Sequence, residues 1–352
     1  MKENISQTFR KYKVNNILFT NVKEIFYLTG EKFDNLWLLF VKDKIYVICS
    51  KTIENQIKDF FANQNITIIC SNMPFYKIVI DILKQNNADK LLIDLKYINA
   101  VDFILINEKL NNEKINIAKK IGILDDIRIV KNTNEINNIK EACRIVSEVC
   151  NIVKDELRPG LSELDIHYRV SELFAKNHVP ESFRSIIASG PNSANPHHIS
   201  SIRKITKNDI VVIDIGCMYN GYCSDLTRTY FLGRIDNNRM EVWNIVRRAQ
   251  SAILKDIKAG MPVSWADKTT REIIAKSGYG YIDKFIHNTG HGVGIEIHEM
   301  PSLSSNAEGI FLTNMTVTVE PGIYIKRDFG VRIEDTILIK ETGCVVLTSA
   351  TY

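Results

Sequence analysis

The sequence lacks the features of membrane-spanning, secreted and nucleic-acid-binding proteins. Its apolar runs, such as residues 36–41, are far shorter than the roughly 18 residues that a spanning helix needs. The beginning of the sequence contains no apolar segment like that of a secretory signal. The formal net charge is only +4, and no block of basic residues suggests a nucleic-acid footprint. We therefore expect a cytoplasmic protein with no membrane and no nucleic-acid partner.

The cysteines lack the pattern of a disulfide framework. They number seven, which is odd, and no Cys-x-x-Cys motif occurs among them. Such usage is typical of reduced thiols in a cytosol. Hydrophobic residues make up 45% and charged residues 24% of the 352 residues, which is enough for two domains with buried cores.

The first third of the chain alternates between strand-like and helix-like patterns. The strand-like runs are residues 17–20, 36–41, 44–50 and 90–95, and the helix-like runs are residues 52–63 and 74–87. This alternation predicts an α/β domain over residues 1–124. Because no cluster of metal ligands occurs there, a structural or oligomerising role is the simplest interpretation of this domain.

The remainder, residues 125–352, begins with a helix-rich stretch. Residues 133–136 (Thr-Asn-Glu-Ile) resemble a helix start, and apolar residues then recur at helical spacing through Val146. From about residue 205 the sequence turns to strand patterns with tight turns. No linker rich in proline, glycine and serine separates the two predicted domains.

The first candidate site residues are two aspartates on a predicted hairpin. Asn220-Gly221 is the strongest short signal for a two-residue turn. The register that this turn sets places Asp214 and Asp225 on one face, with backbones roughly 7–8 Å apart. Two buried carboxylates repel unless one is protonated or a cation lies between them. The alternative is a pair of solvated aspartates, which the apolar neighbours of Asp214 disfavour.

A second candidate segment, residues 287–301, contains His287, His291 and His298 among closely spaced glycines, which allow close backbone approach. Borderline divalent metals favour imidazole ligands, whereas Mg²⁺ and Ca²⁺ prefer oxygen. The alternative is a glycine-rich loop with polar histidines. A phosphate-binding loop is a poor interpretation, because no Lys-Ser or Lys-Thr follows the glycines.

The third segment, residues 315–340, carries two glutamates in strand patterns. Glu320 precedes Pro-Gly and Glu334 follows Arg332, both among β-branched residues, where an unpaired charge is costly. Arg332 could instead neutralise a structural carboxylate. Taken together, four carboxylates and one imidazole suit a pair of transition-metal ions.

These segments resemble the metallopeptidases of the pita-bread fold, specifically the proline peptidases, which include Xaa-Pro aminopeptidase and Xaa-Pro dipeptidase (prolidase). The motifs are the eleven-residue spacing from Asp214 to Asp225, GHGVGIEIHE, VEPGIYI and VRIED. FYLTG at 26–30 and the strand–helix rhythm extend the resemblance to essentially the whole chain. It implies an α/β N-terminal domain of the creatinase/prolidase type followed by an α+β pita-bread metallopeptidase domain.

The resemblance also implies roles for individual residues. The two histidines that bind substrate and stabilise the tetrahedral intermediate fall on His197 and His298, and His287 takes a further substrate position. Arg332 and Tyr324 take positions that orient carboxylates. The metal ligands fall on Asp214, Asp225, His291, Glu320 and Glu334. Among these ligands, Glu320 is also the expected proton acceptor.

Three positions leave questions open. Some prolidases carry an arginine where this chain has Ser302, and that arginine can hold the free carboxylate of a dipeptide. Asn288 stands where the family often has a smaller residue. The spacing to Asp214 favours His197 over His198 as the site histidine, without deciding between them.

The expected function is metal-dependent hydrolysis of the N-terminal Xaa-Pro peptide bond by a Xaa-Pro aminopeptidase, with Xaa-Pro dipeptidase as the alternative. The expected cofactors are two divalent ions, manganese first, with cobalt or zinc as alternatives. The expected partners are peptides with proline second and another copy of the chain in a homodimer. A methionine aminopeptidase normally lacks the preceding α/β domain, a creatinase-type hydrolase lacks the metals, and a non-catalytic binding protein usually loses ligands.

Overall fold

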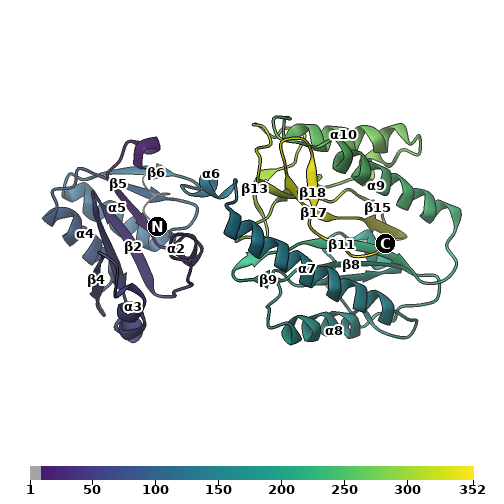
Figure 1. The fold of residues 1–352 in the computed structure, drawn as a ribbon, viewed down its shortest axis with the longest axis horizontal. Helices are drawn as coiled ribbons and strands as arrows, with labels where there is room; N and C mark the ends of the chain where they lie inside the picture. The colour runs from purple at the N-terminus through teal and green to yellow at the C-terminus, as the bar shows by residue number, and fades with distance from the viewer. Residues whose placement is uncertain (1–8) are drawn as a thin grey trace. The chain divides into compact units, whose positions relative to one another are not determined.

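The computed structural model describes residues 9–352 and divides the chain into two compact units, with the division between Ile127 and Arg128. The boundary expected from sequence, after residue 124, lies just before this division. Figure 1 labels the helices and strands of both units. No helix in the described part of the chain combines the length and the apolar character that crossing a membrane requires.

The N-terminal unit contains one mixed six-stranded sheet with the strand order β4-β3-β2-β1-β5-β6. Its strands are β1 (Asn16–Phe19), β2 (Leu36–Val41), β3 (Lys44–Cys49), β4 (Thr67–Cys70), β5 (Lys90–Asp94) and β6 (Asn116–Lys120). Its helices are α2 (Val22–Thr29), α3 (Glu54–Phe61), α4 (Phe75–Gln85) and α5 (Ala100–Asn112), and α6 (Asp125–Arg128) crosses the division. Every strand and helix expected here is present within a few residues of its expected ends, whereas β4, β6, α2, α5 and α6 were not predicted individually.

Both faces of this sheet are covered, as β2 illustrates. All six of its residues are buried. Leu38 and Phe40 belong to the core shared with α2 and α3, whereas Trp37 and Leu39 belong to the core shared with α4 and α5. Since successive strand residues point to opposite faces, a continuous apolar run is what such a doubly covered strand requires.

The C-terminal unit places its strands between two pairs of helices (Figure 1). The helices are α7 (Thr133–Glu156), α8 (Glu163–Lys176), α9 (Asn237–Asp256) and α10 (Ser264–Lys276). The strands are β7 (Ile186–Ser189), β8 (Ile210–Ile215), β9 (Met218–Tyr219), β10 (Tyr222–Cys223), β11 (Leu226–Phe231), β12 (His291–Gly292), β13 (Glu299–Ser302), β14 (Thr316–Val319), β15 (Gly322–Ile325), β16 (Phe329–Arg332), β17 (Asp335–Ile339) and β18 (Cys344–Val346). They form sheets with the orders β11-β8-β7 and β13-β12-β14-β17-β18, with β9–β10 and β15–β16 as separate ribbons.

The helix start expected near residue 133 is confirmed. The Asn132 side chain accepts hydrogen bonds from the backbone N–H groups of Asn134 and Glu135, and the Glu135 side chain accepts one from the Asn132 N–H. This reciprocal pair of bonds satisfies donors that a helix N-terminus otherwise leaves unpaired. The helix then runs through Glu156 with one buried face.

The expectation of strands from residue 205 onward is wrong for residues 237–276, where α9 and α10 lie. Asp236 caps α9 by accepting a hydrogen bond from the Arg239 N–H. Buried apolar residues follow at Val242, Val246 and Ala249, which is the spacing of one helix face. The signal was therefore present in the sequence.

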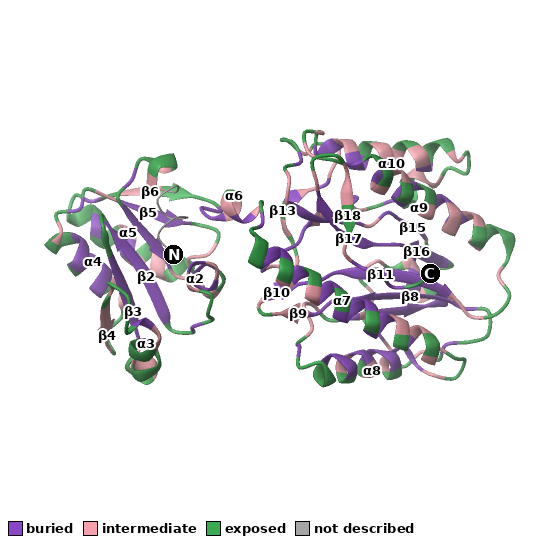
Figure 2. Cartoon of the chain, in the orientation of Figure 1, coloured by how far each residue is buried: buried purple, intermediate pink, exposed green. Residues whose placement is uncertain are grey.

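The hairpin register expected around Asn220-Gly221 is confirmed. Tyr219 pairs with Tyr222, and Asp214 pairs with Thr227. Asn220 and Gly221 have φ angles of 45° and 82°, the positive values that this tight turn requires. Figure 2 shows β8 as buried throughout and β11 as buried up to its last residue, Phe231, which is partly buried.

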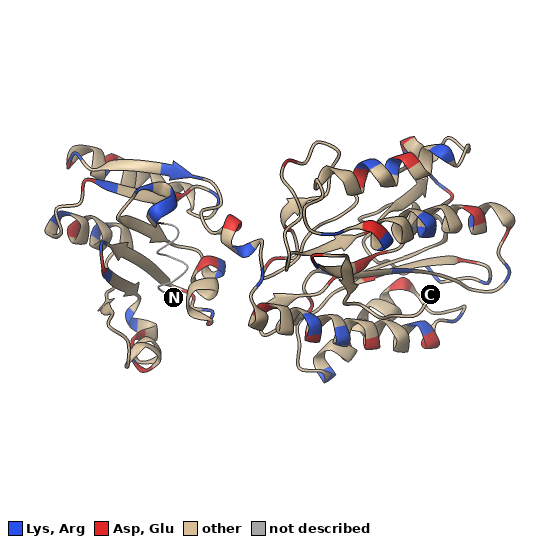
Figure 3. Ribbon diagram, turned by 45° about the horizontal axis from the view of Figure 1, so that its top comes forward, with Lys and Arg blue, Asp and Glu red and all other residues tan. Residues whose placement is uncertain are grey.

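The two helix pairs of the C-terminal unit are joined in the same way. Between α7 and α8, the Gly160 N–H donates to the Ile205 carbonyl over 2.9 Å. Between α9 and α10, the Gly260 N–H donates to the Phe311 carbonyl over 2.8 Å. Both glycines have positive φ, 96° and 87°. The unit thus contains two similar halves, one built around α7 and α8 and the other around α9 and α10. In Figure 3, positively and negatively charged residues both occur along these helices.

Candidate metal centre and active site

Three side chains from separate segments meet inside the C-terminal unit. Asp225 precedes β11, His291 begins β12 and Glu334 lies between β16 and β17. One ligand atom from each lies within 4.8 Å of the other two. Asp225 and Glu334 are buried and His291 is half-buried. An imidazole and two carboxylates at this spacing are able to share one cation.

Asp214 and Glu320 border the same cluster. His291 Nε2 lies 3.2 Å from Glu320 Oε1 and 3.5 Å from Asp225 Oδ2. Asp214 stands on β8, diagonal to Asp225 in the hairpin, and its charge acts directly on Asp225. The five residues expected to bind metal therefore lie together.

Burial and mutual repulsion dominate the electrostatics of this cluster. Burial, followed by the charge of Asp214, raises the pKa of Asp225 well above its usual range. Burial, followed by the charge of Asp225, does the same to the pKa of Glu334. Burial also acts to raise the pKa of Glu320, but the hydrogen bond and charge of His291, together with the charges of His287 and Arg332, outweigh it and lower that pKa to about 2. A cation among these carboxylates would remove the repulsion.

Two buried carboxylate oxygens test whether a metal fits. Asp214 Oδ1 and Glu334 Oε1 are inaccessible to water and have no hydrogen-bond partner among the described residues. A buried anion without a partner is costly. Glu334 belongs to the cluster and Asp214 borders it, so divalent cations would supply the partners that the protein does not. The donor set, rich in carboxylate with one imidazole, fits transition-metal ions.

Arg332 connects several parts of the site. It is buried, and its guanidinium donates to Asp214 Oδ2, to Tyr324 OH over 2.8 Å and to Thr227 Oγ1 over 3.1 Å. Thr227 Oγ1 in turn donates to Glu334 Oε2 over 2.6 Å. Arg332 and Thr227 together fix the orientation of two carboxylates of the cluster.

Two histidine rings stand beside the cluster. His287 Nε2 lies 2.8 Å from Tyr324 OH. The His298 ring packs edge-on against His291, with centroids 4.3 Å apart. Burial is the first cause of the lowered pKa of both His287 and His298, and the charge of His197 contributes to both.

The neighbouring histidines 197 and 198 have different surroundings. His198 is half-buried, and its Nε2 lies 2.7 Å from the buried carboxylate of Glu163. His197 is exposed. His198 is thus held by α8, whereas His197 follows directly after Pro196, whose carbonyl accepts a hydrogen bond from Arg332 over 3.3 Å.

The glycines on either side of His291 let neighbouring backbone segments approach closely, as expected. A Cβ at Gly290 would lie 2.1 Å from the Thr318 carbonyl oxygen, and one at Gly292 would lie 2.2 Å from the Met300 carbonyl oxygen. Neighbouring backbone therefore fills the space that any other side chain would need. The His291 N–H donates to Thr318 Oγ1 over 3.0 Å, which holds the histidine between the two glycines.

Sequence reasoning missed Thr227 and Glu163. The hairpin register pairs Thr227 with Asp214, so the turn alone could have indicated Thr227. No local signal indicated Glu163, because its partners come from residues 189–201. Ser302, which replaces the arginine of some prolidases, accepts a hydrogen bond from the Asn288 side chain over 3.1 Å.

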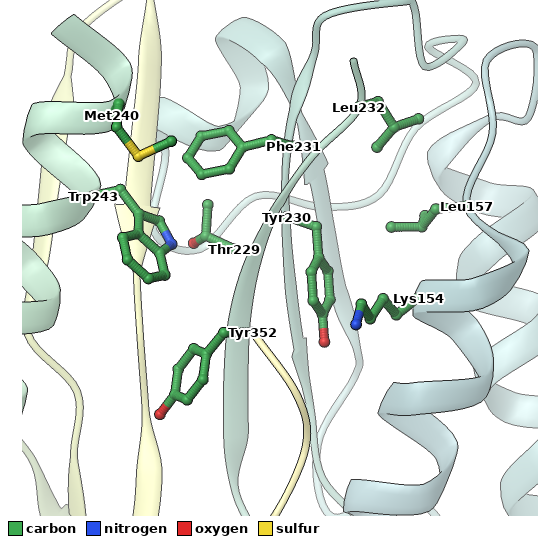
Figure 4. Close-up of a pocket in the computed structure, with 9 residues that line it drawn as sticks. All are labelled: Lys154, Leu157, Thr229, Tyr230, Phe231, Leu232, Met240, Trp243 and Tyr352. Atoms are coloured by element: carbon green, nitrogen blue, oxygen red, sulfur yellow. The ribbon is translucent and has the colours of Figure 1, made fainter. Parts of the chain in front are cut away.

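A separate pocket of about 450 Å³ lies between β11 and α9 (Figure 4). Its walls include Lys154, Tyr230, Trp243 and Tyr352. None of the predicted site residues borders it. The pocket is therefore distinct from the carboxylate cluster.

Comparisons with known proteins agree with this geometry. The sequence profile of metallopeptidase family M24 matches residues 137–341. A Xaa-Pro dipeptidase of Pyrococcus furiosus is 42% identical over 240 residues, 67% of this chain and 68% of that protein. The solved structure of a Xaa-Pro dipeptidase from Bacillus anthracis has a TM-score of 0.93 and 31% identity, with 99% of this chain and 97% of that chain covered. The structure of an X-Pro aminopeptidase from Thermotoga maritima has a TM-score of 0.87 and 27% identity, with 98% of each chain covered.

Proposed function

The chain belongs to metallopeptidase family M24, and we propose that it hydrolyses the N-terminal Xaa-Pro peptide bond of peptides as a Xaa-Pro aminopeptidase. Its fold is the pita-bread metallopeptidase fold preceded by an α/β domain. The observation that carries the proposal is the cluster of Asp225, His291 and Glu334, whose ligand atoms approach within 4.8 Å. The orphaned oxygens of Asp214 and Glu334 support a second cation beside the first.

Five residues would hold the cofactor. When bound, two divalent ions polarise a carbonyl and lower the pKa of water. We infer manganese as the first choice, with cobalt or zinc as alternatives. The proposed ligands are Asp214, Asp225, His291, Glu320 and Glu334. Arg332 keeps the Asp214 carboxylate in position, since it donates directly to Oδ2.

The protein's own side chains would accept the proton from water and donate hydrogen bonds to the substrate. Glu320 borders the cluster as an ionised carboxylate, and we assign it the proton of the attacking water. His298 and His197 would donate hydrogen bonds to the oxygen that becomes negative as the carbonyl carbon turns tetrahedral. His287 would bind substrate, and its bond to Tyr324 fixes its ring.

A bond to proline suits such a site. The Xaa-Pro amide has no N–H, so a protease that clamps its substrate as a β-strand loses a donor there. Recognition through side chains that reach the carbonyl does not need that N–H. The histidines around the cluster are side chains of this kind.

Substrate length separates the aminopeptidase from the dipeptidase alternative. A dipeptidase must bind a carboxylate close behind the scissile bond, and burying that charge requires a cation or several donors. Ser302 supplies no charge at the position where some prolidases have arginine, and its hydroxyl already bonds Asn288. The names of the Pyrococcus furiosus and Bacillus anthracis proteins favour the alternative, which therefore remains the second candidate.

The deciding experiment compares kcat/KM for three substrates: a Xaa-Pro dipeptide, the same sequence extended by two residues, and the dipeptide amide. We expect the extended peptide to be cleaved at least as well as the dipeptide. A tenfold or greater preference for the free dipeptide over both others would establish the dipeptidase instead, because ~1.4 kcal/mol of selective carboxylate binding is a tenfold effect. Assays with chelator and with added Mn²⁺, Co²⁺ or Zn²⁺ test the cofactor.

The cellular setting is also a proposal. None of the seven cysteines forms a disulfide in the described part of the chain, which supports a reducing cytoplasm. We infer a homodimer, which sedimentation analysis would test, and no nucleic-acid or membrane partner.

A further inference from the structure

Glu163 is a buried carboxylate outside the metal cluster that collects an unusual number of donors. It is the first residue of α8, and its side chain is fully inaccessible to water. Oε1 accepts from the Ser189 N–H and hydroxyl, both over 2.8 Å, and from the Asn192 amide over 3.0 Å. Oε2 accepts from the Ser201 N–H over 3.0 Å and its hydroxyl over 2.7 Å. His198 Nε2, also at 2.7 Å, completes the set.

These donors bracket a single loop. Ser189 precedes it, Ser201 is its last residue, and Asn192 and His198 lie within it. One carboxylate thus ties the two ends of residues 190–201 together and holds the loop at two points between them. Because an ionised carboxylate only accepts hydrogen bonds, the His198 ring donates through Nε2, which fixes the ring against α8.

The charge on Glu163 is maintained by these bonds. Burial acts to raise the pKa of Glu163, but the hydrogen bonds from Ser201, Asn192 and His198 outweigh it, and the net result is a lowered pKa. The loop is therefore fastened to an anion at neutral pH. Charge-assisted hydrogen bonds of this kind are stronger than neutral ones.

The opposite side of the loop is fastened to the active site. The Arg332 guanidinium donates to the Pro196 carbonyl over 3.3 Å, and the Gly330 N–H donates to Ser193 Oγ over 2.9 Å. A Cβ at Gly330 would lie 2.1 Å from the Ser193 carbonyl oxygen, so the loop packs directly on β16. His197 lies between the Pro196 contact and the His198 contact.

We propose that Glu163 and His198 are positioning residues, which hold the loop so that His197 faces the substrate. The proposal rests on the proposed peptidase function. Neither residue needs to touch substrate, because His198 turns toward α8 while the adjacent His197 is exposed. The buried carboxylate converts a surface loop, normally a mobile element, into a fixed support for one donor.

A double-mutant cycle tests this coupling. We would measure kcat/KM on an Xaa-Pro peptide for His198→Ala in the wild-type and in the His197→Ala background. In the wild-type background we expect a loss on the order of 10- to 100-fold, since misplacing a group by ~1 Å costs up to about 10²-fold. In the His197→Ala background the loss should shrink to less than about threefold, because no histidine remains to be positioned. Equal losses in both backgrounds would overturn the proposal.

Matched variants separate positioning from general destabilisation. His198→Gln keeps an N–H donor and should retain more activity than His198→Ala. Glu163→Gln should behave like His198→Ala, whereas Glu172→Gln, which changes an exposed glutamate on the same helix, should match the wild type. Bound metal should stay at the wild-type level in all four. A matching loss of metal would show that the substitutions disturb the cluster, and would also overturn the proposal.

Hydrogen exchange of residues 190–201 tests whether Glu163 and His198 hold the loop, and it does not depend on catalytic activity. We expect exchange in this loop to accelerate in His198→Ala and Glu163→Gln but not in Glu172→Gln, since only the first two remove bonds to the loop. Unchanged exchange would show that Glu163 does not hold the loop. A wild-type chain without activity on any Xaa-Pro peptide would overturn the proposed function, and exchange would then decide alone whether the loop is fastened in this way.

Discussion

Each half of the C-terminal unit uses a buried carboxylate to hold the segment that carries a site histidine. The two halves differ in the groups that stabilise the buried negative charge. In the α7–α8 half, Glu163 accepts hydrogen bonds from the N–H and the hydroxyl of Ser189. In the α9–α10 half, Asp267 accepts bonds from the N–H and the hydroxyl of Thr289, over 3.1 and 3.0 Å. Each buried carboxylate thus fastens a segment that leads to a site histidine.

The difference lies in the cation. Arg271 Nε donates to Asp267 over 2.7 Å, and the same guanidinium continues to the His287 carbonyl over 2.9 Å. Among the described residues, Glu163 is bonded by backbone N–H, hydroxyl, amide and imidazole groups and by no arginine or lysine. The two similar halves therefore stabilise a buried carboxylate differently. Asp267 is paired with a cation, whereas Glu163 is stabilised by several weaker hydrogen-bond donors.

The metal cluster combines contributions from both halves. The α7–α8 half supplies Asp214 and Asp225 from one hairpin, and the α9–α10 half supplies His291, Glu320 and Glu334. Neither half holds the complete donor set. The two halves must therefore meet correctly before the site exists.

The largest expected effect comes from removing one ligand of either half. Asp225→Ala and Glu334→Ala should each lower kcat/KM at least about 10³-fold, because the lost electrostatic stabilisation is worth several kcal/mol and ~1.4 kcal/mol is tenfold. Elemental analysis should show reduced metal in both variants. Glu341→Gln, an exposed change, serves as the control. If one of the two alanine variants kept full metal and activity, the site would not depend equally on both halves.

Arg332 provides the next largest effect, since it joins the halves directly. It bonds Asp214 in one half and Tyr324 in the other. Arg332→Lys keeps the charge but loses the planar fork, so metal affinity or kcat/KM should fall roughly 10- to 100-fold. Metal titration and steady-state kinetics would measure this. Arg327→Lys, at an exposed turn, should leave both values at the wild-type level. A wild-type result for Arg332→Lys would mean that charge alone suffices.

Sequence reasoning predicted features set by neighbouring residues better than contacts between segments that lie far apart in the chain. The Asn220-Gly221 turn fixed the hairpin register, and with it the shared face of Asp214 and Asp225. The roles of the histidines followed only from the resemblance to a family. Glu163 resembled an ordinary residue of a helix start, because its donors arrive from a loop more than twenty residues away. Local patterns do not encode such contacts.

The two buried carboxylates should differ in stability and in pH dependence. Glu163→Gln leaves several donors without an acceptor and should cost about 2–4 kcal/mol, whereas Asp267→Asn should cost about 1–2 kcal/mol, because Arg271 is one-third exposed and can be hydrated. Since the folded-state pKa of Glu163 lies below its usual 4.5, its stabilisation is complete above that pH and disappears as the pH falls through the lowered value.

Urea unfolding at several pH values would measure this difference. The gap in midpoint between the wild type and Glu163→Gln should stay constant from pH 7 to about 5 and close at lower pH. A gap that persisted unchanged in acid would indicate that packing, rather than the charge, carries the contribution of Glu163. An equal cost for both substitutions at pH 7 would remove the distinction between the two halves.

The smallest expected effect concerns another place where the halves meet, the pocket of Figure 4. Lys154 of α7 and Trp243 of α9 border it. The Trp243 indole N–H is buried without an acceptor in the part of the chain that the structure describes, so Trp243→Phe removes a donor that makes no bond there. The free energy of unfolding should change by less than about 1 kcal/mol and kcat/KM by less than about twofold. A tenfold loss of kcat/KM at wild-type stability would show that this contact between the halves, like Arg332, is coupled to the active site.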